Sequence, residues 1–332
     1  MAEGKWIGGL TADARLTDAA KRVLSVRLRA VGEALPRAVQ EANRDPEYVH
    51  QLRVATRRAD AALRIFAPCL PGKVHKKARG RLRRLRRAAG AARDWDVFLL
   101  GIAERRTKQP EKEQHGLNFL FAYAFGLRSG AQADLESAGA EEHQSLDAFI
   151  EATTAAVCPA TDFPDGAVLL LLARPLLTAR LHELDWTAAG DLQDYAHLHQ
   201  VRIAGKRLRY AMEVFADCFS LSFRDELYPR VEDMQEILGR ANDSHVAEAR
   251  LADLRRHLRR GWPAEWKRVQ PGVESLLRFH QRRLPLERKR FMQWWDEWGK
   301  TGAPALTAVL GGETLEPAPL NAGAEANRVG QR

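Results

Sequence analysis

Histidine, arginine and lysine side chains recur along one face of two predicted helices. In the first helix these side chains are His50, Arg53, Arg57 and Arg64. In the second helix they are His199, Arg202, Lys206 and Arg209. At 100° per residue, each set occupies a narrow arc of the helix surface. Arg and Lys donate charge-assisted hydrogen bonds to anionic oxygens, and a protonated His does the same, so both faces are suited to binding an anion.

A third basic face follows the first one along the chain. The segment from 76 to 93 contains nine basic residues and no acidic residue. The basic side chains that share one face of this segment are Lys76, Arg79, Arg83, Arg86 and Arg87. Like charges at helical spacing repel by roughly a few tenths of a kcal/mol per pair, so an anionic partner would stabilise all three faces. The alternative is that each face is merely solvated, which is the usual situation of a basic helix surface.

His50 and His199 each begin a basic face, and two interpretations of them are open. A histidine at this place can be a buried or helix-start residue with no further role. It can also donate hydrogen bonds to phosphate oxygens, in which case its charge responds to pH. The recurrence of both histidines before the same basic pattern favours the second interpretation.

Sequence motifs of catalysis and of metal binding are absent. The chain has no GxxxxGK[ST] loop, no HExxH and no GxSxG. Its three cysteines, Cys69, Cys158 and Cys218, are too few and too scattered for a disulfide framework or a CxxC zinc site, and we interpret them as packing thiols in a reducing compartment. We therefore expect a binding protein and not an enzyme, with no cofactor and no metal.

Each basic face must be held by a helix whose opposite face is apolar. The apolar side chains of the first helix are Leu52, Ala55, Ala59, Leu63, Phe66 and Leu70. Those of the second are Val201, Ala204, Leu208, Met212, Phe215 and Phe219. Helical periodicity continues through nearly the whole chain without the alternation typical of strands, which predicts an all-α fold of about ten helices.

Local signals predict where some of these helices end or bend. Gly90 suits a helix C-terminus and Asp94 the N-cap of a following helix. Gly239 and Asp243 repeat this pair in the second half of the chain. Pro36 lies within an otherwise continuous pattern, so we expect that helix to be kinked or broken.

The two helices with basic faces belong to an internal repeat at a constant shift of 149 residues. HQLRVATRRADAALRIFAPCL, from 50 to 70, aligns without a gap on HQVRIAGKRLRYAMEVFADCF, from 199 to 219, and GAARDWDV aligns on GRANDSHV at the same shift. We infer two copies of one multi-helix unit. The expected organisation is an extension over 1–14, a first repeat over 15–155, a linker over 156–164, a second repeat over 165–298 and a disordered tail over 299–332.

The composition indicates a folded protein with an acidic partner. The 332 residues carry a formal net charge of +9, with a pI near 9.7, which leaves nucleic acid, polyphosphate, anionic lipid and acidic protein open as partners. The sequence has neither a secretory signal pattern nor an apolar run long enough to span a bilayer. We therefore expect a cytoplasmic protein without a membrane segment.

The segments HQLRVATRRADAALRIF and HQVRIAGKRLRYAMEVF resemble the CHAD family of α-helical domains, and GAARDWDV and GRANDSHV are similar to the loop motif of each CHAD repeat. The resemblance spans about 16 to 298. It implies two helical bundles with pseudo-twofold symmetry around a basic channel that binds inorganic polyphosphate. A polyphosphate-binding module of this kind could in turn place the protein on polyphosphate granules. By motif position, the implied contacts are His50, Arg53, Arg57, Arg58, His199, Arg202, Lys206, Arg207 and Arg209.

Two departures from the family pattern make the implied site lopsided. The first copy has Asp60 where the pattern has a basic residue equivalent to Arg209. The second-copy positions equivalent to Lys76, Arg79, Arg83 and Arg87 are Asp225, Tyr228, Glu232 and Glu236. We therefore expect the first copy to contribute more of the positive field, with Arg180 or Arg224 compensating.

Two other functions share parts of this charge pattern. A nucleic-acid-binding protein would have the same basic faces, but the sequence has no helix-turn-helix, RNP motif or aromatic–basic interleaving. A phosphotransfer or phosphohydrolase enzyme could use His50 or His199 as its nucleophile, although no general base is evident. Polyphosphate binding is the interpretation that the residues and the resemblance favour together.

Overall fold

The computed structural model describes residues 4–107 and 109–312. These residues form helices and no strand, with one isolated backbone bridge between Arg15 and Val168, so the all-α class is confirmed. The first five helices are α1 (Leu16–Gln40), α2 (Glu47–Ile65), α3 (Gly72–Arg106), α4 (Glu111–His143) and α5 (Leu146–Ala155). The next five are α6 (Leu169–Ala188), α7 (Tyr195–Phe215), α8 (Tyr228–Gly261), α9 (Pro263–Glu297) and α10 (Ala303–Gly311). The short helical segments are η1 (Ala67–Cys69), η2 (Ala216–Cys218), η3 (Phe223–Leu227) and η4 (Trp298–Gly302).

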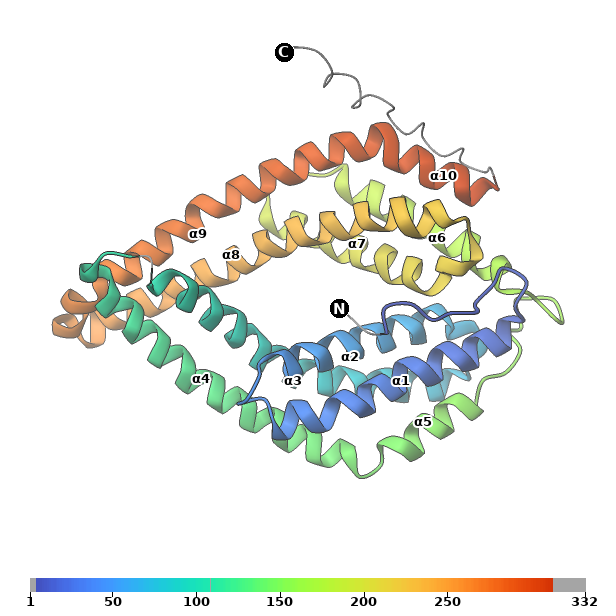
Figure 1. The fold of residues 1–332 in the computed structure, drawn as a ribbon, viewed down its shortest axis with the longest axis horizontal. Coiled ribbons are helices and arrows are strands. Elements are labelled where there is room, and N and C mark those ends of the chain that lie inside the picture. The colour runs from blue at the N-terminus through green and yellow to red at the C-terminus, as the bar shows by residue number, and fades with distance from the viewer. Residues whose placement is uncertain (1–3, 108, 313–332) are drawn as a thin grey trace, which may run out of the picture.

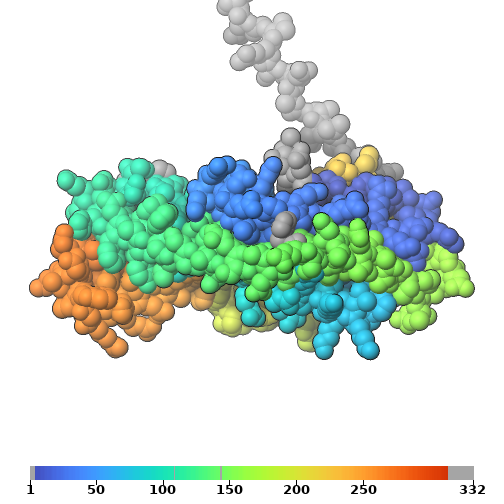
Figure 2. Space-filling model, turned by 90° about the horizontal axis from the view of Figure 1, so that it is seen from below, coloured from blue at the N-terminus to red at the C-terminus, as the bar shows by residue number. Residues whose placement is uncertain are grey.

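The helices form two groups in an elongated molecule, α1 to α5 in one and α6 to α10 in the other (Figure 1). The groups touch where α2 packs on α7 and where α4 packs on α9. Figure 2 shows α4 and α5 running along one long face, with the tip of α8 and α9 beside the adjoining ends of α3 and α4. The basic-faced helices α2 and α7 therefore meet at the boundary between the two groups.

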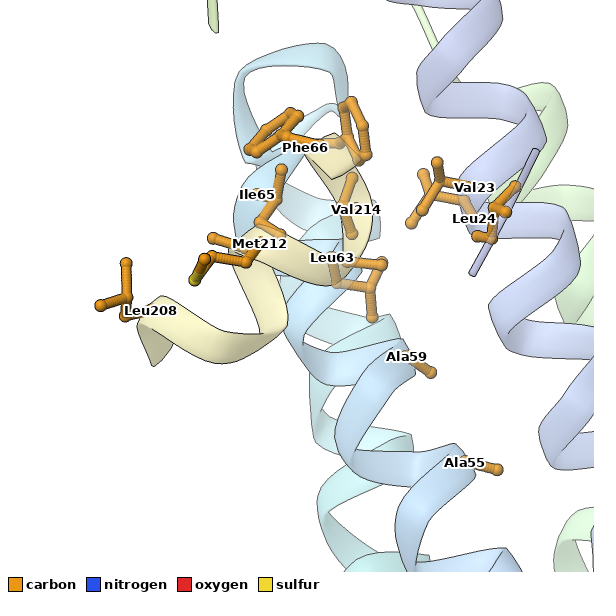
Figure 3. Close-up of a cluster of buried hydrophobic side chains, with 14 of the residues drawn as sticks. Val23, Leu24, Ala55, Ala59, Leu63, Ile65, Phe66, Leu208, Met212 and Val214 are labelled. Atoms are coloured by element: carbon orange, nitrogen blue, oxygen red, sulfur yellow. The ribbon is translucent and has the colours of Figure 1, made fainter. Parts of the chain in front are cut away.

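The apolar face of α2 is buried in the main hydrophobic core. Ala55, Ala59 and Leu63 project toward α1, the helix that carries Val23 and Leu24 (Figure 3). Full burial of one large aliphatic side chain of this kind stabilises the fold by roughly 1.5–3 kcal/mol. The corresponding face of α7 joins the same core. Burial of the two apolar faces fixes the rotation of both helices and so directs their basic faces away from the core.

The tip of the molecule has a smaller core of its own between α3, α4, α8 and α9. In this region α4 and α9 cross at Gly116 and Gly272. A Cβ on Gly116 would collide with the carbonyl oxygen of Val269, and a Cβ on Gly272 would collide with that of Glu113. The missing side chains let the two backbones touch, and this crossing joins the two groups of helices away from the α2–α7 contact.

Two helices continue through positions that the sequence predicted as helix ends. Gly90 and Asp94 lie inside α3, and Gly239 and Asp243 lie inside α8, so the predicted breaks were wrong. A Cβ on Gly90 would lie 2.5 Å from Nη1 of Arg53. This glycine therefore makes room for the Arg53 guanidinium rather than ending a helix.

Two further expectations about helix ends need correction. Helix α1 continues from Leu16 to Gln40 with Pro36 inside it, so the expected break was wrong, whereas the expected kink stays a prediction. The predicted disordered tail begins too early, because residues 303–311 form α10, which packs on α6 and buries Leu306 and Leu310. Apolar contacts with other helices thus order a segment in which the sequence shows no helical periodicity. Residues 299–302 of the predicted tail belong to η4, and residues 313–332 lie outside the described residues.

The order of elements is similar in the two groups. Helices α2, α3 and α4, with η1 after α2, correspond under the 149-residue shift to α7, α8 and α9, with η2 after α7. The internal repeat itself stays an interpretation of the sequence, and so does the predicted channel.

Candidate functional site

A cleft of about 720 Å³ lies where α2, α3 and α7 meet. The basic side chains that line it are Arg53, Arg57, Arg64, Arg83, Arg86, Arg87, Lys206 and Arg207. Two carboxylates, those of Asp60 and Asp94, line it as well. The cleft therefore has a large excess of positive charge, and side chains from both predicted copies contribute to it.

Asp60 connects arginines of α2 and α3. Its carboxylate accepts hydrogen bonds from Nε of Arg64 at 3.1 Å, Nε of Arg79 at 3.0 Å and Nη1 of Arg86 at 2.9 Å. Burial of Asp60, which is 6% exposed, would by itself raise the pKa of its carboxyl. The surrounding arginines, Arg64 first, outweigh burial and hold this pKa below 3.8. Asp60 therefore stays ionised and orients the arginines while it neutralises part of their charge.

Arg53 is held in place by residues of α3. Its Nη2 atom lies 3.3 Å from Oδ1 of Asp94, in the space that Gly90 leaves open. Burial, followed by the nearby charge of Arg57, lowers the pKa of Arg53 to about 10. The guanidinium therefore remains charged at neutral pH, and its ion pair with Asp94 fixes its position in the cleft lining.

Four basic side chains of the cleft have no carboxylate partner among the residues that the structure describes: Arg57, Arg83, Arg87 and Lys206. Arg83 and Arg87 are exposed on α3, whereas Arg57 and Lys206 are half-buried where α2 meets α7. Burial, followed by the charges of Arg57 and Arg202, lowers the pKa of Lys206 to about 5. An anion gains most at such positions, because no resident carboxylate has to be displaced.

A neutralised network occupies the other side of the α2–α7 contact. Nε of Arg58 lies 2.8 Å from Oε2 of Glu213, and these two side chains are 10% and 1% exposed. Oε1 of Glu213 lies 3.3 Å from Nη1 of Arg209 and accepts a hydrogen bond of 2.9 Å from the Tyr228 hydroxyl. Burial opposes the charged form of Arg209, but the carboxylate of Glu213 outweighs burial and raises the pKa of Arg209. Arg58 and Arg209, which the resemblance implied as ligand contacts, are thus engaged in buried ion pairs.

The segment before α1 covers this network. Nζ of Lys5 lies 2.9 Å from Oε2 of Glu232 and 4.2 Å from the centre of the Tyr228 ring. The buried Arg27 guanidinium donates a hydrogen bond of 2.8 Å to the backbone oxygen of Lys5. Trp6 packs edge-on against Tyr228 at 4.8 Å between ring centres. Residues near the N-terminus therefore close and neutralise the side of the contact that α8 contributes.

The two histidines lie near the first turns of α2 and α7 and do not line the cleft. Asp194 fixes the start of α7 by accepting hydrogen bonds from the next backbone N–H groups. Burial, followed by the charge of Arg93, lowers the pKa of His50. Burial, followed by Arg202 and Lys206, lowers the pKa of His199. Both imidazoles are therefore mainly neutral at pH 7.

The remaining predicted side chains lie at the margins of the site. Lys76 is exposed on α3 outside the cleft lining, and Arg79 turns toward Asp60. Arg202 is half-buried beside Arg57, and its Nε atom has no hydrogen-bond partner among the described residues. The expected compensation by Arg180 or Arg224 was wrong. Arg180 pairs with Glu183 at 2.6 Å, Arg224 lies over the Trp6 ring, and neither lines the cleft.

Two residues that line the cleft were not predicted as site residues from the sequence. The sequence predicts Asp94 as an N-cap, whereas in the structure its carboxylate pairs with Arg53. Tyr210 lines the cleft at the edge of the apolar face of α7, and no sequence signal marks it. Conversely, Arg81 and Arg84 of the basic run face away from the cleft and bind Glu142 of α4.

Within residues 4–107 and 109–312, no group of three or more His, Cys, Asp or Glu side chains is placed to hold a metal ion. No helix in the same part of the chain has the length and apolar character needed to cross a membrane.

Comparisons with known proteins place the sequence and the fold in the same group. The sequence model of the CHAD domain matches residues 22–252. The crystal structure of the CHAD domain from the plant Ricinus communis shares 27% identity with a TM-score of 0.66, over 86% of this chain and 93% of that one. PptA from Streptomyces chartreusis shares the fold at 20% identity with a TM-score of 0.63, over 85% of this chain and 100% of that one. No protein with a curated description matches.

Proposed function

The chain belongs to the CHAD family, and from that premise we propose that it binds inorganic polyphosphate in the cleft between α2, α3 and α7. One observation carries the proposal: eight basic side chains line the cleft against two carboxylates. Both carboxylates are already engaged in ion pairs with arginines. The excess charge therefore belongs to side chains that an anion can reach.

Polyphosphate is a flexible strand of phosphates with no bases or sugars to recognise. A receptor for it needs closely spaced donors along a groove and little else. The arginine forks bind pairs of phosphate oxygens, and Lys206 supplies a compact point charge. Each contact also displaces a counterion from the strand, so the affinity should fall steeply with salt concentration.

We further propose that the protein binds this ligand without turning it over. His50 and His199, the candidate nucleophiles of the alternative enzyme hypothesis, lie outside the cleft lining. The arginines around the cleft favour retention of a phosphate chain. Measurement of orthophosphate release and of acid-labile phosphohistidine tests this point, and either product in the wild type but not in a double His50→Asn, His199→Asn variant would support the enzyme instead.

The binding proposal is tested by titrating long-chain polyphosphate into the protein calorimetrically at several salt concentrations. A triple variant, Arg57→Ala, Arg83→Ala and Arg87→Ala, removes three unpaired cations of the cleft. We expect a loss of at least about 100-fold in affinity, because hydrogen bonds to charged groups contribute about 1.5–3 kcal/mol each. The slope of log affinity against log salt should decrease by about 2 to 3.

A matched control separates the cleft from the overall charge. Arg256, Arg259 and Arg260 are exposed near the end of α8, far along the chain from the cleft lining. Their combined replacement by Ala changes the net charge equally and should leave the affinity within about threefold, because surface substitutions away from a binding site have small effects. Equal losses in both triple variants would refute the site. Displacement of polyphosphate by DNA or RNA at equal phosphate concentration would favour a nucleic-acid-binding function.

A cellular role follows from the same proposal. Binding in the cleft would place the protein on polyphosphate granules. A fluorescent fusion of the full chain should therefore gather on granules, and the cleft triple variant should not. Granule localisation that survives in the cleft variant would contradict this role.

A further inference from the structure

Lys206 differs from the other seven cations of the cleft because it can lose its proton. The other seven are arginines, and even Arg53, whose pKa is lowered to about 10, stays mostly protonated up to pH 9. A lysine amine releases its proton readily when burial and like charges oppose the ammonium form. In a crowded cationic cleft, Lys206 is therefore the group at which charge is most easily removed.

The charged groups that act most strongly on Lys206 are themselves cationic. From α2, Arg57 and Arg53 face it, and from its own helix Arg202 and Arg209 do so. His199 lies two turns back on α7, and Tyr210 lies one turn ahead. Across the cleft, α3 presents Arg83, Arg86 and Arg87.

The acidic groups in reach are already engaged by other cations. Asp94 pairs with Arg53, and Asp60 accepts hydrogen bonds from three arginines. Glu213 pairs with Arg58 and Arg209 on the far side of the contact. Glu183 of α6 and Glu232 of α8, two helices that also pack on α7, pair with other cations. Within the described residues, Lys206 has no ion pair of its own.

We propose that Lys206 is a proton-linked contact: its amine is uncharged in the empty cleft and takes up a proton when a polyphosphate strand enters. This inference rests on the proposed function and adds a regulation of the same site by pH. The burial and like charges that depress the pKa of Lys206 to about 5 support it. A phosphate strand supplies the missing negative charge and so restores the ammonium form.

The linkage gives polyphosphate affinity a defined dependence on pH. Above the pKa of the empty cleft, each bound strand must recruit a proton from solvent. Affinity should therefore fall as pH rises, by up to about tenfold per pH unit for one linked proton. At pH 8.5, His50 and His199 are neutral in the empty protein because both have lowered pKa values, and a Lys206→Arg control separates proton uptake by Lys206 from uptake by these imidazoles.

The test is calorimetric titration of the full chain with long-chain sodium polyphosphate at pH 8.5, in Tris and in EPPS, whose ionisation enthalpies differ. In the wild type, the difference in apparent binding enthalpy should correspond to about one proton taken up per filled cleft. The control is Lys206→Arg, which keeps a cation and cannot release its proton. This variant should bind with no proton uptake and with an affinity nearly constant between pH 6.5 and 9.

The outcomes separate the linkage from the proposed function. Strong binding with equal enthalpies in both buffers, or equal proton uptake in Lys206→Arg, would overturn the linkage and leave polyphosphate binding intact. Absence of binding would overturn both. The free protein gives an independent reading, because the ¹³Cε resonance assigned by Lys206→Arg should titrate near pH 5. A titration of that resonance above pH 9 would also overturn the proposal.

Discussion

Asp60 and Arg209 occupy equivalent positions of α2 and α7 under the 149-residue shift, yet they carry opposite charges and each is surrounded by the other sign. Asp60 accepts hydrogen bonds from three arginines. Arg209 lies 3.3 Å from Glu213 and 3.5 Å from Glu232. The same position of the repeated helix therefore holds an acid among cations in the first group, and a cation among acids in the second.

The neighbours of this pair follow the same inversion. Glu213 stands at the position equivalent to Arg64, and Glu232 stands at the position equivalent to Arg83. Lys5, from outside the repeat, then neutralises Glu232. The acidic side becomes a closed internal network, whereas the basic side keeps unpaired cations at an open cleft. This is why α3 lines the cleft, together with α2 and α7, and α8 does not.

Adjacent arginines on α2 should respond in opposite ways to substitution. Arg58→Ala removes a partner of the buried Glu213 and should lower the free energy of unfolding by about 3 kcal/mol. Arg57→Ala removes a cation with no carboxylate partner among the described residues, so stability should stay within about 0.5 kcal/mol or rise slightly. Polyphosphate affinity should fall at least about tenfold in Arg57→Ala. Urea denaturation and calorimetry of both variants check this, and equal destabilisation would contradict the assignment.

Asp60→Asn should show how much the ionised Asp60 carboxylate contributes to the free energy of unfolding. The pKa of the Asp60 carboxyl lies below 3.8 in the folded protein, despite burial, because of Arg64 and its neighbours. Its contribution is therefore fully present above pH 3.8 and is lost as pH falls through the lower folded-state pKa. We expect Asp60→Asn to lose about 2 kcal/mol at pH 7, because the arginine partners are partly exposed and can be solvated, with a smaller difference from the wild type at pH 3. Denaturant titrations at both pH values measure this, and a difference that does not shrink in acid would count against the network.

Much of the contact between α2 and α7 could be predicted from the sequence, because the two faces of each helix are set by that helix's own residues. The basic and apolar faces of α2 and α7 follow from helical periodicity, and Leu63 and Leu208 are buried as that pattern predicts. The engagement of Asp60 by Arg79 and Arg86 could not be predicted, because it depends on the register of α3 against α2.

The errors in the helix ends have the same physical origin. Gly90 and Asp94 have the local chemistry of a helix end, but their contact with Arg53 from another helix explains both residues inside α3. Helix α10 is likewise ordered by burial of Leu306 and Leu310 against distant elements. Tertiary contacts thus decide features that local signals leave open or misassign.

Lys206→Met should change how stability depends on pH. The folded-state pKa of Lys206 is about 5, below the value of an unfolded lysine, so between these values the unfolded chain binds more protons. The stability of the wild type should therefore rise with pH in this window, by up to about 1.4 kcal/mol per pH unit from this residue. The variant should be more stable than the wild type at pH 6, and this advantage should shrink by pH 9. Urea denaturation across this range checks the sign, and an advantage that grows with pH would contradict it.

Two glycines of α4 should give opposite effects when a methyl group is added. At Gly116 a Cβ would collide with the Val269 carbonyl oxygen at the crossing with α9, so Gly116→Ala must separate the helices. We expect a loss of about 2 kcal/mol or more, in the range of overpacked cores. Gly126 lies on the same helix, is exposed and has no atom within 4 Å of an added Cβ. Gly126→Ala should therefore stabilise the helix by about 0.5–1 kcal/mol, because alanine has the higher helix propensity. Thermal unfolding of both variants tests the crossing, and similar shifts in Tm would show that α4 and α9 are not held by this contact.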